Sequence, residues 1–371
     1  MKLSIEKNDL SGALNHVQSA VENRTTIPIL SNVLMRAESG ELTLTTTDMD
    51  MSIVERVQAS IGVDGELTAP AKTLYEIARK LPDGSQIHME LDDATHQLRV
   101  HSGRSKFNLQ TLDPKDFPVL SDGNLPHHFQ MKADDLKHLL NTTSFAISNE
   151  ETRYYLNGIY FHIDPDSRLL VSVATDGHRL AKATVKAPDG SNDIPGIIIP
   201  RKAVGELRRL LEEYDDVVEI SISEAKIRFA IGQIILTSKL IDGKFPDYSR
   251  VIPSSNDQTL ELNSQVLNHT VDRVTTIAVE KVRAVKMSIQ KKLIKLSASS
   301  TNNNSHGEDE IECDYNGKKI EIGFNAKYLS EIAGQIAKSN IIFKLSDETS
   351  PALIYNSEDD SVLFVLMPMR I

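Results

Sequence analysis

Residues 72–77 read Lys-Thr-Leu-Tyr-Glu-Ile, and the chain repeats this pattern twice within its 371 residues. The later copies begin at Lys202 and Lys327, so successive copies are 130 and 125 residues apart. Other landmarks recur between the first two copies: Asp9-Leu10 with Asp135-Leu136, Thr47-Asp48 with Thr175-Asp176, and Phe117-Pro118 with Phe245-Pro246. The third copy is the weakest match. Because repetition at a nearly constant spacing indicates one structural unit used several times, we predict three homologous domains, at residues 1–125, 126–252 and 253–371.

Each unit has the same internal order of predicted elements. A first helix carries an apolar stripe, formed by Leu10, Leu14, Val17 and Val21, by Leu136, Leu140, Thr143 and Ile147, and by Val266, Thr270, Val274 and Ile277. The repeated segment is a second helix, whose stripe is Leu74, Ile77, Ala78 and Leu81 in the first copy and Leu329, Ile332, Ala333 and Ile336 in the third. Pro70 and Pro200 suit the first helical position, and Asn325 suits an N-cap.

Strand signals surround these helices. Residues 42–46 and 170–174 are β-rich, and Glu38-Ser39-Gly40 and Asp164-Pro165-Asp166 are typical of turns. The predicted fold class is therefore α+β: two helices packed on antiparallel sheet, repeated in three tandem domains.

The composition excludes several classes of protein. The chain has 41 basic and 52 acidic residues, a formal charge of −11, and 40% hydrophobic residues. That apolar content is too high for a disordered chain, and no apolar run is long enough to span a bilayer. The lone Cys313 excludes a disulfide framework and a cysteine-rich zinc site. The N-terminus resembles a strand and no signal peptide. We expect an acidic, cytoplasmic protein with no membrane partner, no metal and no cofactor.

The second helices are basic opposite their apolar stripes, although the chain as a whole is acidic. The residues are Lys72, Arg79 and Lys80 in the first copy, Arg201, Lys202, Arg208 and Arg209 in the second, and Lys327 and Lys338 in the third. Glu76, Glu206 and Glu331 make these faces mixed, and for one helix ordinary solvated charges explain the pattern. If three copies surround an axis, their helices form a wall that binds phosphates without reading sequence.

Four motifs point to a known family. They are Arg153-Tyr-Tyr-Leu-Asn-Gly158, Ala174-Thr-Asp-Gly-His-Arg-Leu180, Phe245-Pro-Asp-Tyr248 and Met367-Pro-Met-Arg-Ile371. Over essentially its whole length the chain resembles the bacterial DNA polymerase III β subunit, the sliding clamp. The resemblance implies a head-to-tail homodimer that closes six domains into a ring, with twelve helices lining the hole. It also implies a DNA replication processivity factor that has no active site of its own and serves a DNA-directed DNA polymerase holoenzyme.

The implied ring has room for duplex DNA. Twelve helices about 10 Å wide give a circumference of about 120 Å, and a hole of about 28 Å remains inside them. Groove depths imply a B-DNA duplex of about 20 Å, which leaves a water layer for loose phosphate contacts. The implied partners are double-stranded DNA held topologically, a second copy of the chain, the catalytic subunit of the replicative polymerase, the clamp loader complex, and other DNA polymerases and repair proteins that carry clamp-binding peptides.

The resemblance assigns DNA contact to six residues, Arg24, Lys72, Arg79, Tyr154, Tyr155 and Lys202. Lys72 keeps the charge of the arginine often found in the family but lacks its forked donor. Glu150 and Glu151 stand where relatives often have uncharged polar residues, which weakens the case for phosphate binding by the whole loop. The alternative for Tyr154 and Tyr155 is a buried pair on a strand.

The resemblance also implies a pocket for partner peptides between the second and third domains and the C-terminal tail. Its residues are Leu156, Thr175, Gly177, His178, Arg179, Leu180, Pro246, Arg250, Val251, Val365, Met367, Pro368, Met369 and Arg370. The methionines offer an adaptable apolar floor, and Arg179, Arg250 and Arg370 are expected to hold polar groups at the rim. The alternative is that residues 362–366 form only a final core strand, and both descriptions can hold together.

The dimer contact implied by the resemblance brings the end of domain one against domain three. Phe107 and Leu109 are expected to face Thr276 and Ile277, while Arg104 and Lys106 are expected to pair with acidic residues at 308–310, including Glu308. Thr276 is more polar than the aliphatic residue expected there. We therefore expect charge pairs to supply more of the dimer affinity, which makes that affinity sensitive to salt.

Two other functions fit parts of the sequence. An enzyme would use Asp176 with His178, or Asp48 with Asp50, because strand spacing would put each pair on one face. No nucleophile motif, phosphate loop or metal-spaced cluster accompanies them. A protein-binding scaffold without DNA is the other alternative, and release from circular DNA on linearisation distinguishes it from a clamp.

Overall fold

The computed structural model describes residues 1–21, 26–92, 94–121, 123–278, 283–300, 304–336 and 339–370. Its chain forms two compact units, which are described separately. The first unit comprises residues 1–136, 188–195 and 202–240, and the second comprises residues 137–187, 196–201 and 241–371. The candidate DNA-contact residue Arg24 and the helix cation Lys338 lie outside the described residues.

The first unit contains two antiparallel sheets. The elements of its N-terminal part are β1 (Lys2–Glu6), α1 (Lys7–Gln18), η1 (Pro28–Ser31), β2 (Asn32–Glu38), β3 (Glu41–Thr47), β4 (Met51–Gln58), β5 (Ser60–Val63), β6 (Gly65–Pro70), α2 (Ala71–Lys80), β7 (Gln86–Asp92), β8 (Gln97–Ser102), β9 (Ser105–Gln110) and η2 (Pro114–Asp116). They are followed by β10 (His127–Lys132), α4 (Arg201–Leu211), β15 (Val217–Ile222), β16 (Lys226–Ile231) and β17 (Ile234–Lys239). The five-stranded sheet has the order β5-β1-β7-β8-β9, and the eight-stranded sheet has the order β10-β15-β16-β17-β4-β3-β2-β6.

The second unit is built in the same way. Its first elements are α3 (Ala133–Ser144, whose first turn belongs to the first unit), η3 (Glu151–Leu156), β11 (Gly158–Ile163), β12 (Leu169–Thr175), β13 (Arg179–Lys186), β14 (Ile197–Pro200) and η4 (Tyr248–Val251). The rest are β18 (Gln258–Asn263), α5 (Ser264–Thr275), β19 (Ala284–Gln290), β20 (Leu293–Ser300), β21 (Ser305–Glu312), β22 (Asp314–Tyr315), β23 (Ile320–Asn325), α6 (Ala326–Gln335), β24 (Asn340–Leu345), β25 (Ala352–Asn356) and β26 (Val362–Leu366). The nine-stranded sheet has the order β14-β11-β12-β13-β26-β25-β24-β18-β22, and the four-stranded sheet has the order β21-β20-β19-β23.

In each unit one sheet passes from one sequence repeat into the next. In the first unit β17 pairs antiparallel with β4, with Ile234 opposite Glu55 and Ser238 opposite Met51. In the second unit β26 pairs antiparallel with β13, with Arg179 opposite Leu366. The strands in each large sheet are therefore supplied by two successive repeats, a feature that the sequence analysis did not predict.

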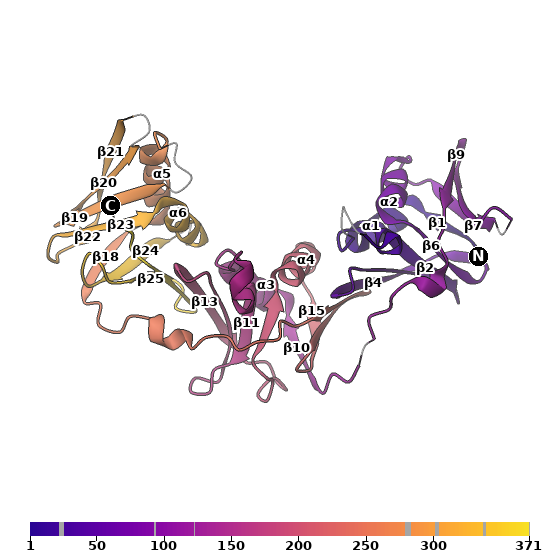
Figure 1. Cartoon of the computed structure of the whole chain (residues 1–371), viewed down its shortest axis with the longest axis horizontal. Coiled ribbons are helices and arrows are strands. Elements are labelled where there is room, and N and C mark those ends of the chain that lie inside the picture. Colours follow the sequence, from indigo (N-terminus) through magenta and orange to yellow (C-terminus); the bar gives the residue numbers. More distant parts are fainter. Residues whose placement is uncertain are drawn as a thin grey trace. The chain divides into compact units, whose positions relative to one another are not determined.

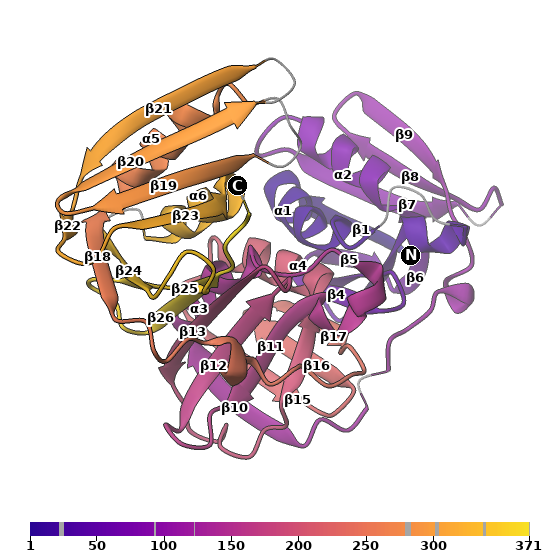
Figure 2. The same ribbon diagram turned by 60° about the vertical axis from the view of Figure 1, so that its left-hand side comes forward.

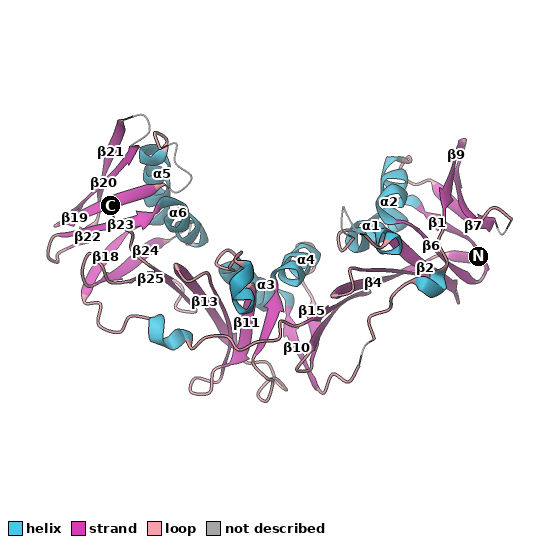
Figure 3. Cartoon of the chain, in the orientation of Figure 1, coloured by secondary structure: helices cyan, strands magenta, loops and turns pink. Residues whose placement is uncertain are grey.

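Helices pack in pairs against these sheets. Helices α1 and α2 lie side by side in the first unit, and α5 and α6 lie side by side in the second (Figure 1, Figure 3). The small sheet of the second unit, with β19, β20 and β21 adjacent, runs across the outside of α5 (Figure 2). The tandem α+β arrangement with antiparallel sheets is thus as predicted.

The predicted helical stripes are mostly buried, with one clear error. Leu10, Leu14 and Val17 have no exposed surface. In the third copy, however, Val266 is 46% exposed, and Leu267 and Val271 occupy the core in its place. The helix begins at the buried Ser264, whose hydroxyl donates to the Ala333 carbonyl at 2.6 Å, so the inward face runs from Ser264 through Leu267 and Val271.

The predicted turn and cap residues give mixed results. Ser39 and Gly40 both have positive φ and form the two-residue turn between β2 and β3, as predicted. Asn325 caps α6, because its side-chain oxygen accepts from the amides of Lys327 and Tyr328. Pro70 and Pro200 do not start their helices: each is the last residue of a strand, paired with Asn32 and Gly158, and the helix begins one residue later.

We expect Gly158→Ala to lower the free energy of unfolding by about 1–3 kcal/mol, the usual cost of overpacking. A Cβ atom at this position would overlap the backbone carbonyl of Ile199 on the adjacent strand, and backbone has little freedom to move there. The measurement is urea denaturation of the full chain. The control is Gly334→Ala in α6, where no atom lies within 4 Å of the new Cβ atom; helix propensity predicts a gain of about 0.5–1 kcal/mol there. Equal effects at both positions would contradict this packing argument.

Candidate functional site

The motif Thr175–Leu180 forms the tight hairpin between β12 and β13. The Asp176 carboxylate accepts from the amides of His178 at 2.9 Å and Arg179 at 3.0 Å. The Thr175 hydroxyl donates to the Arg179 carbonyl at 2.6 Å, and Gly177 has φ +87°. Asp176 therefore shapes a turn, so the prediction that it shares a strand face with His178 is wrong.

The earlier Thr-Asp pair does the same in the hairpin between β3 and β4. The Asp48 carboxylate accepts from the amides of Asp50 at 3.0 Å and Met51 at 2.7 Å, and the Thr47 hydroxyl donates to the Met51 carbonyl. Asp48 and Asp50 thus lie in a turn and not on one strand face. Within the described residues no group of three or more His, Cys, Asp or Glu side chains is suited to holding a metal ion.

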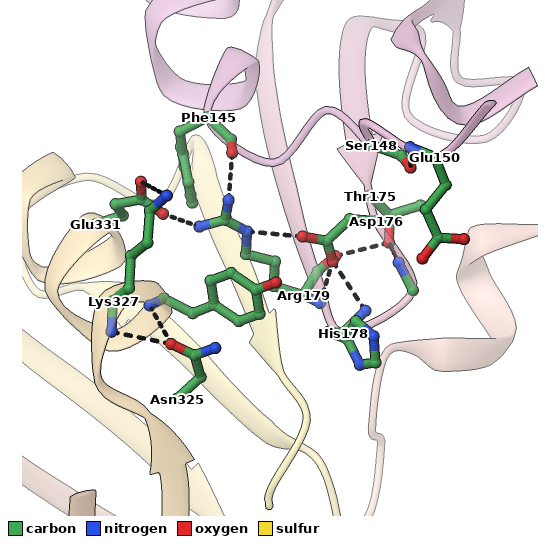
Figure 4. A network of polar contacts seen from close by, with 12 residues as sticks. Phe145, Ser148, Glu150, Thr175, Asp176, His178, Arg179, Asn325, Lys327 and Glu331 are labelled. Atoms are coloured by element: carbon green, nitrogen blue, oxygen red, sulfur yellow. Dashed lines mark hydrogen bonds and ion pairs between the residues drawn. The ribbon is translucent and has the colours of Figure 1, made fainter. Parts of the chain in front are cut away.

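Arg179 is buried at the centre of a polar network (Figure 4). Only 7% of its surface is exposed. Its guanidinium donates to Asp176 at 3.1 Å, to Glu331 on α6, and to the Phe145 carbonyl at 2.5 Å. It also lies over the rings of Phe145 at 4.9 Å and Tyr328 at 4.1 Å. Most of its hydrogen-bonding capacity is thus used within the chain, and its side chain also lines the cavity described below.

The sequence analysis missed three residues of this network. Phe145, Tyr328 and Glu331 are 34, 149 and 152 positions from Arg179. Glu331 belonged to the repeated helix pattern, but nothing local indicated its partner. A cavity of about 410 Å³ adjoins the network, and it is lined by Asn149, Glu150, His178, Lys327 and Tyr328 among others.

An apolar cluster lies on the other side of the same hairpin. Leu156, Leu180 and Val365, three predicted pocket residues, are buried in it together with Val171, Val173, Ile198, Phe245 and Leu353. Tyr155, Tyr160, Tyr248 and Leu363 are partly buried against it. The structure therefore brings together strands that are far apart in the sequence, as the predicted pocket requires.

Other predicted pocket residues stay on the surface near this cluster. Pro246, Val251 and Met367 are exposed, and so is Arg250, whose guanidinium pairs with Asp247 at 2.8 Å. Residues 362–366 are strand β26 between β13 and β25, so the core-strand alternative is confirmed for them. Beyond it the Met367 amide donates to the His178 carbonyl at 2.9 Å and the Met369 amide to the Gly323 carbonyl at 2.8 Å.

The C-terminal residues line a second cavity. It has a volume of about 590 Å³ and is lined by Pro368, Met369 and Arg370 on one side and by Lys286, Glu321 and Thr349 among others on the other. Hydrogen bonds from Lys286 and then Lys319 lower the pKa of Glu321 to about 2. The cavity wall thus carries an ionised Glu321 that is paired with two lysines, and Arg370 beside it is exposed.

A histidine is packed among the tyrosines at the edge of the apolar cluster. The His162 ring stacks on Tyr160 at 4.5 Å, and Tyr160 stacks on Phe245 at 4.9 Å. His162 Nδ1 lies 3.0 Å from the Ile163 carbonyl and Nε2 lies 3.0 Å from the Tyr248 hydroxyl. The carbonyl requires a proton on Nδ1, so neutral Nε2 accepts from Tyr248. Burial lowers the pKa of His162 and raises the pKa of Tyr248 to about 12.

The candidate DNA-contact residues are on helix α2, on α4 and in η3. Arg79 pairs with Glu76 at 2.8 Å, and Lys202 pairs with Asp48. Lys72 is half-buried. The helix faces are mixed, as the sequence analysis described, and their acids engage several of the cations.

Tyr154 and Tyr155 do not form a pair on a strand. Both lie in the 3₁₀ helix η3, with their rings edge to face at 5.8 Å, so that alternative is wrong. Tyr154 is 54% exposed, whereas Tyr155 packs against the apolar cluster. Arg153 in the same segment pairs with Glu150 at 2.6 Å.

The candidate dimer residues lie on two strands at sheet edges. Phe107 and Leu109 are on β9, the last strand of the five-stranded sheet, and Glu308 is on β21, the last strand of the four-stranded sheet. Glu308 pairs with Lys295 at 2.7 Å, and Asp309 pairs with Arg273 at 2.7 Å. Thr276 follows α5 and donates its hydroxyl to the Asp272 carbonyl.

Comparison with known proteins gives matches along the whole chain. Models of the N-terminal, central and C-terminal domains of the DNA polymerase III beta subunit match residues 1–121, 130–247 and 249–370. The chain is 47% identical to a beta sliding clamp of Caulobacter vibrioides and 35% identical to that of Escherichia coli K12, covering 100% of each chain. Its fold is similar to the crystal structure of a Bartonella birtlesii sliding clamp bound to griselimycin, with a TM-score of 0.97 and 47% identity over 100% of both chains. No helix in the described ranges is long and apolar enough to cross a membrane.

We expect Arg179→Ala to lower the free energy of unfolding by about 3–5 kcal/mol, because Glu331 and Asp176 would lose a buried countercharge. Arg179→Lys should also be strongly destabilising, since one ammonium cannot replace a fork that reaches three acceptors. Arg250→Ala is the control. The side chain of Arg250 is 83% exposed and it makes a single ion pair, so its loss should cost less than about 1 kcal/mol. Chemical denaturation of the three variants measures the difference, and similar losses for Arg179 and Arg250 would refute the buried-network role.

A pH dependence follows from the half-buried His162. Because burial lowers the pKa of His162 in the folded state, the unfolded chain takes up its proton first as the pH falls. The free energy of unfolding should therefore decrease below about pH 6.5, the ordinary value for histidine. We expect His162→Gln to make the decrease between pH 7 and 5 shallower in denaturation measured across that range. An unchanged slope would show that other groups carry the pH dependence.

Proposed function

The chain belongs to the family of the DNA polymerase III β subunit, and on that premise we propose how its own residues serve this subunit's work. The β sliding clamp is the non-catalytic processivity factor of DNA polymerase III in bacterial DNA replication. The match of three tandem domain models along the whole chain carries this conclusion. We propose that the boundaries between the domains lie at residues 125 and 252 and that the protein works in the cytoplasm.

We propose that two copies join head to tail through their open sheet edges. Strand β9 carries Lys106, follows Arg104 and presents apolar Phe107, whereas β21 carries Glu308, Asp309 and Glu310. Neither strand has a second partner in the described part of the chain, and an unpaired edge strand readily pairs with another chain. Opposite charges on the two edges favour β9 against β21 over either strand against itself. Thr276 and Ile277 would flank this seam.

The proposed ring holds double-stranded DNA by topology and touches it weakly. The candidate contacts are Arg24, Lys72, Arg79, Tyr154, Tyr155 and Lys202. Because Arg79 and Lys202 already have carboxylate partners, each phosphate contact exchanges one ion pair for another. The net gain per contact is then small, which suits a protein that must move along the duplex without reading its sequence.

We propose that partner peptides bind over the apolar cluster beneath the Phe245–Val251 loop. Pro246, Arg250, Val251, Met367, Pro368, Met369 and Arg370 would contact the peptide at the surface, with His178, Gly177 and Thr175 at one end. Leu156, Leu180 and Val365 supply the buried floor. We propose that Arg179 does not contact the peptide as first expected and instead fixes the hairpin through its bonds to Asp176 and Glu331. The expected owners of such peptides are the polymerase catalytic subunit, the clamp loader, other DNA polymerases and repair proteins.

Retention on circular DNA tests the clamp function. Loaded by a clamp loader, the protein should stay on nicked circular DNA at moderate salt and leave when the circle is cut once. Lys106→Glu should reduce retention at least several-fold, because it places like charges across the seam. In dilute solution the same variant should lower the molar mass from that of a dimer, twice 41.2 kDa, toward the 41.2 kDa of a single chain.

The matched control is Lys291→Glu, at an exposed lysine in the turn between β19 and β20, which should behave as the unmodified protein. Equal retention on circular and linear DNA would rule out topological binding. A Lys106→Glu protein that keeps its dimer mass would instead rule out the proposed seam while leaving the clamp function standing.

A further inference from the structure

The two large sheets have the same strand order and register, but their outward side chains differ. In the first unit the order β15-β16-β17-β4-β3-β2-β6 corresponds to β24-β25-β26-β13-β12-β11-β14 in the second. The register agrees as well. Ser52 lies opposite Thr237, which lies opposite Arg228, just as Leu180 lies opposite Val365, which lies opposite Leu353. Each position over the apolar cluster of the second unit therefore has a counterpart in the first.

Three neighbouring counterparts differ in the same direction. Where the second unit has the buried apolar residues Leu180, Val365 and Leu353, the first has Ser52, Thr237 and Arg228. Two rows further along strand β4, Arg56 lies opposite Thr43, where the second unit pairs Thr184 with Val171. In the row between them the difference is reversed, because Val54 has Lys182 as its counterpart. The first unit thus exchanges an apolar floor for hydroxyl groups and two arginines.

This surface of the first unit is hollow. Outward side chains of β2, β3, β4 and β17, together with the segment 118–121, enclose a cavity of about 580 Å³. A line of three aliphatic residues and one threonine crosses its middle and is called the apolar line below, because Leu34, Thr45, Val54 and Ile235 lie opposite one another on four successive strands. Val119 in the adjoining segment is exposed, and Lys226 donates to the Ser121 carbonyl at 2.5 Å and so ties that segment to β16.

Two arginines stand on either side of the apolar line. Arg56 is two residues beyond Val54 on β4, and Arg228 belongs to the row of Ser52, two residues before Val54. Strand geometry separates these rows by about 13 Å along the strand direction. Among the residues that the structure describes, neither guanidinium has a hydrogen bond or an ion pair, whereas Arg36 in the same cavity pairs with Glu66 at 3.2 Å. Two cationic groups in a cavity wall are thus available to a ligand.

We propose that this groove binds an extended peptide segment in which an aliphatic side chain is flanked, two residues away on each side, by carboxylates. The aliphatic group would lie on Leu34, Val54 and Ile235, and the carboxylates would pair with Arg56 and Arg228. In an extended chain, residues i, i+2 and i+4 share one face and span about 13 Å, which matches the separation of the arginine rows along the strand direction. Arg56 and Arg228 are also two strands apart, about 10 Å across the sheet, so the peptide would cross the strands obliquely and the long arginine side chains would reach its carboxylates. The inference goes beyond the proposed function, because it uses a different sheet and none of the residues proposed for the partner peptide.

A peptide fits the charges of the cavity better than a nucleic acid. Glu38 and Glu41 line the same cavity beyond Arg36. A strand with a phosphate at every nucleotide would meet these carboxylates, whereas a peptide carries its negative charges only at the positions facing arginines. The apolar line also favours an aliphatic side chain, since burying it removes apolar surface from water.

The probe is the pentapeptide Glu-Ser-Leu-Ser-Glu, blocked at both ends, added to the full-length protein with labelled isoleucine, leucine and valine methyl groups. We expect saturable NMR shifts at Leu34, Val54 and Ile235 that are absent at Leu180 and Val365. The peptide Lys-Ser-Leu-Ser-Lys should bind at least tenfold more weakly. Arg56→Gln with Arg228→Gln should weaken the glutamate peptide at least tenfold, and Arg56→Glu with Arg228→Glu should abolish the shifts.

The matched control is Lys132→Glu, an exposed charge on β10 in the same sheet, which should leave the affinity unchanged. Unaltered methyl signals of the second unit show that each variant is folded. The proposal is overturned if the arginine variants bind the glutamate peptide as well as the unmodified protein does, or if the peptide causes no shifts at millimolar concentration. It is also overturned if an eight-nucleotide thymidine strand shifts the same methyls and displaces the peptide. Failure of the clamp test leaves this experiment unaffected, because the groove lies within one unit.

Discussion

The pairing of the last strand of one repeat with the fourth strand of the preceding repeat is the constraint on which the rest of this structure depends. Strands β17 and β4 in the first unit, and β26 and β13 in the second, each make a continuous ladder of backbone hydrogen bonds. Without these pairings four strand edges would expose unpaired amides and carbonyls. The two smaller sheets take no part in this pairing, and among their edge strands in the described chain are β9 and β21, which carry opposite charges. The large sheets thus join the repeats within one chain, and the small sheets supply the two strands that we propose for self-association.

The β3–β4 and β12–β13 hairpins, which lie beside these pairings, have the same backbone turn but different side chains after it. In both, a Thr-Asp pair binds the turn, and the residue two positions after Thr has positive φ: Met49 at 77° and Gly177 at 87°. The residue that follows the turn is Met51 in the first and Arg179 in the second, and both are buried. Met51 needs no polar partner. Arg179 is desolvated and requires Asp176, Glu331 and the Phe145 carbonyl, since an unpaired buried charge is very unfavourable. The apolar cluster of the second unit therefore lies beside a rigid polar anchor that the first unit lacks.

Many of the charged side chains on the helices are paired with an opposite charge nearby. The chain carries a net charge of −11, yet its helices present cations to solvent. Several of these cations are neutralised locally, as Glu76 pairs with Arg79 and Glu206 pairs with Arg209 at 3.0 Å. A surface of exchangeable ion pairs attracts a polyanion only weakly and has no preferred register along it. In the proposed ring, enclosure keeps the protein on the duplex, and weak contacts let it move along the duplex.

The sequence alone determined the features that depend on neighbours within a few residues. The threefold repeat, the helix stripes, the Ser39-Gly40 turn and the Asn325 cap could be predicted, because periodicity and capping act over one or two turns of chain. Local rules failed where distant residues meet. Val266 is exposed on a helix whose first residue, Ser264, bonds to Ala333, and the buried Arg179 is paired with Glu331, 152 positions away in the chain. The order of strands across repeats belongs to the same class. Strand pairing and charge burial are set by which surfaces meet, and only the tertiary structure brings those surfaces together.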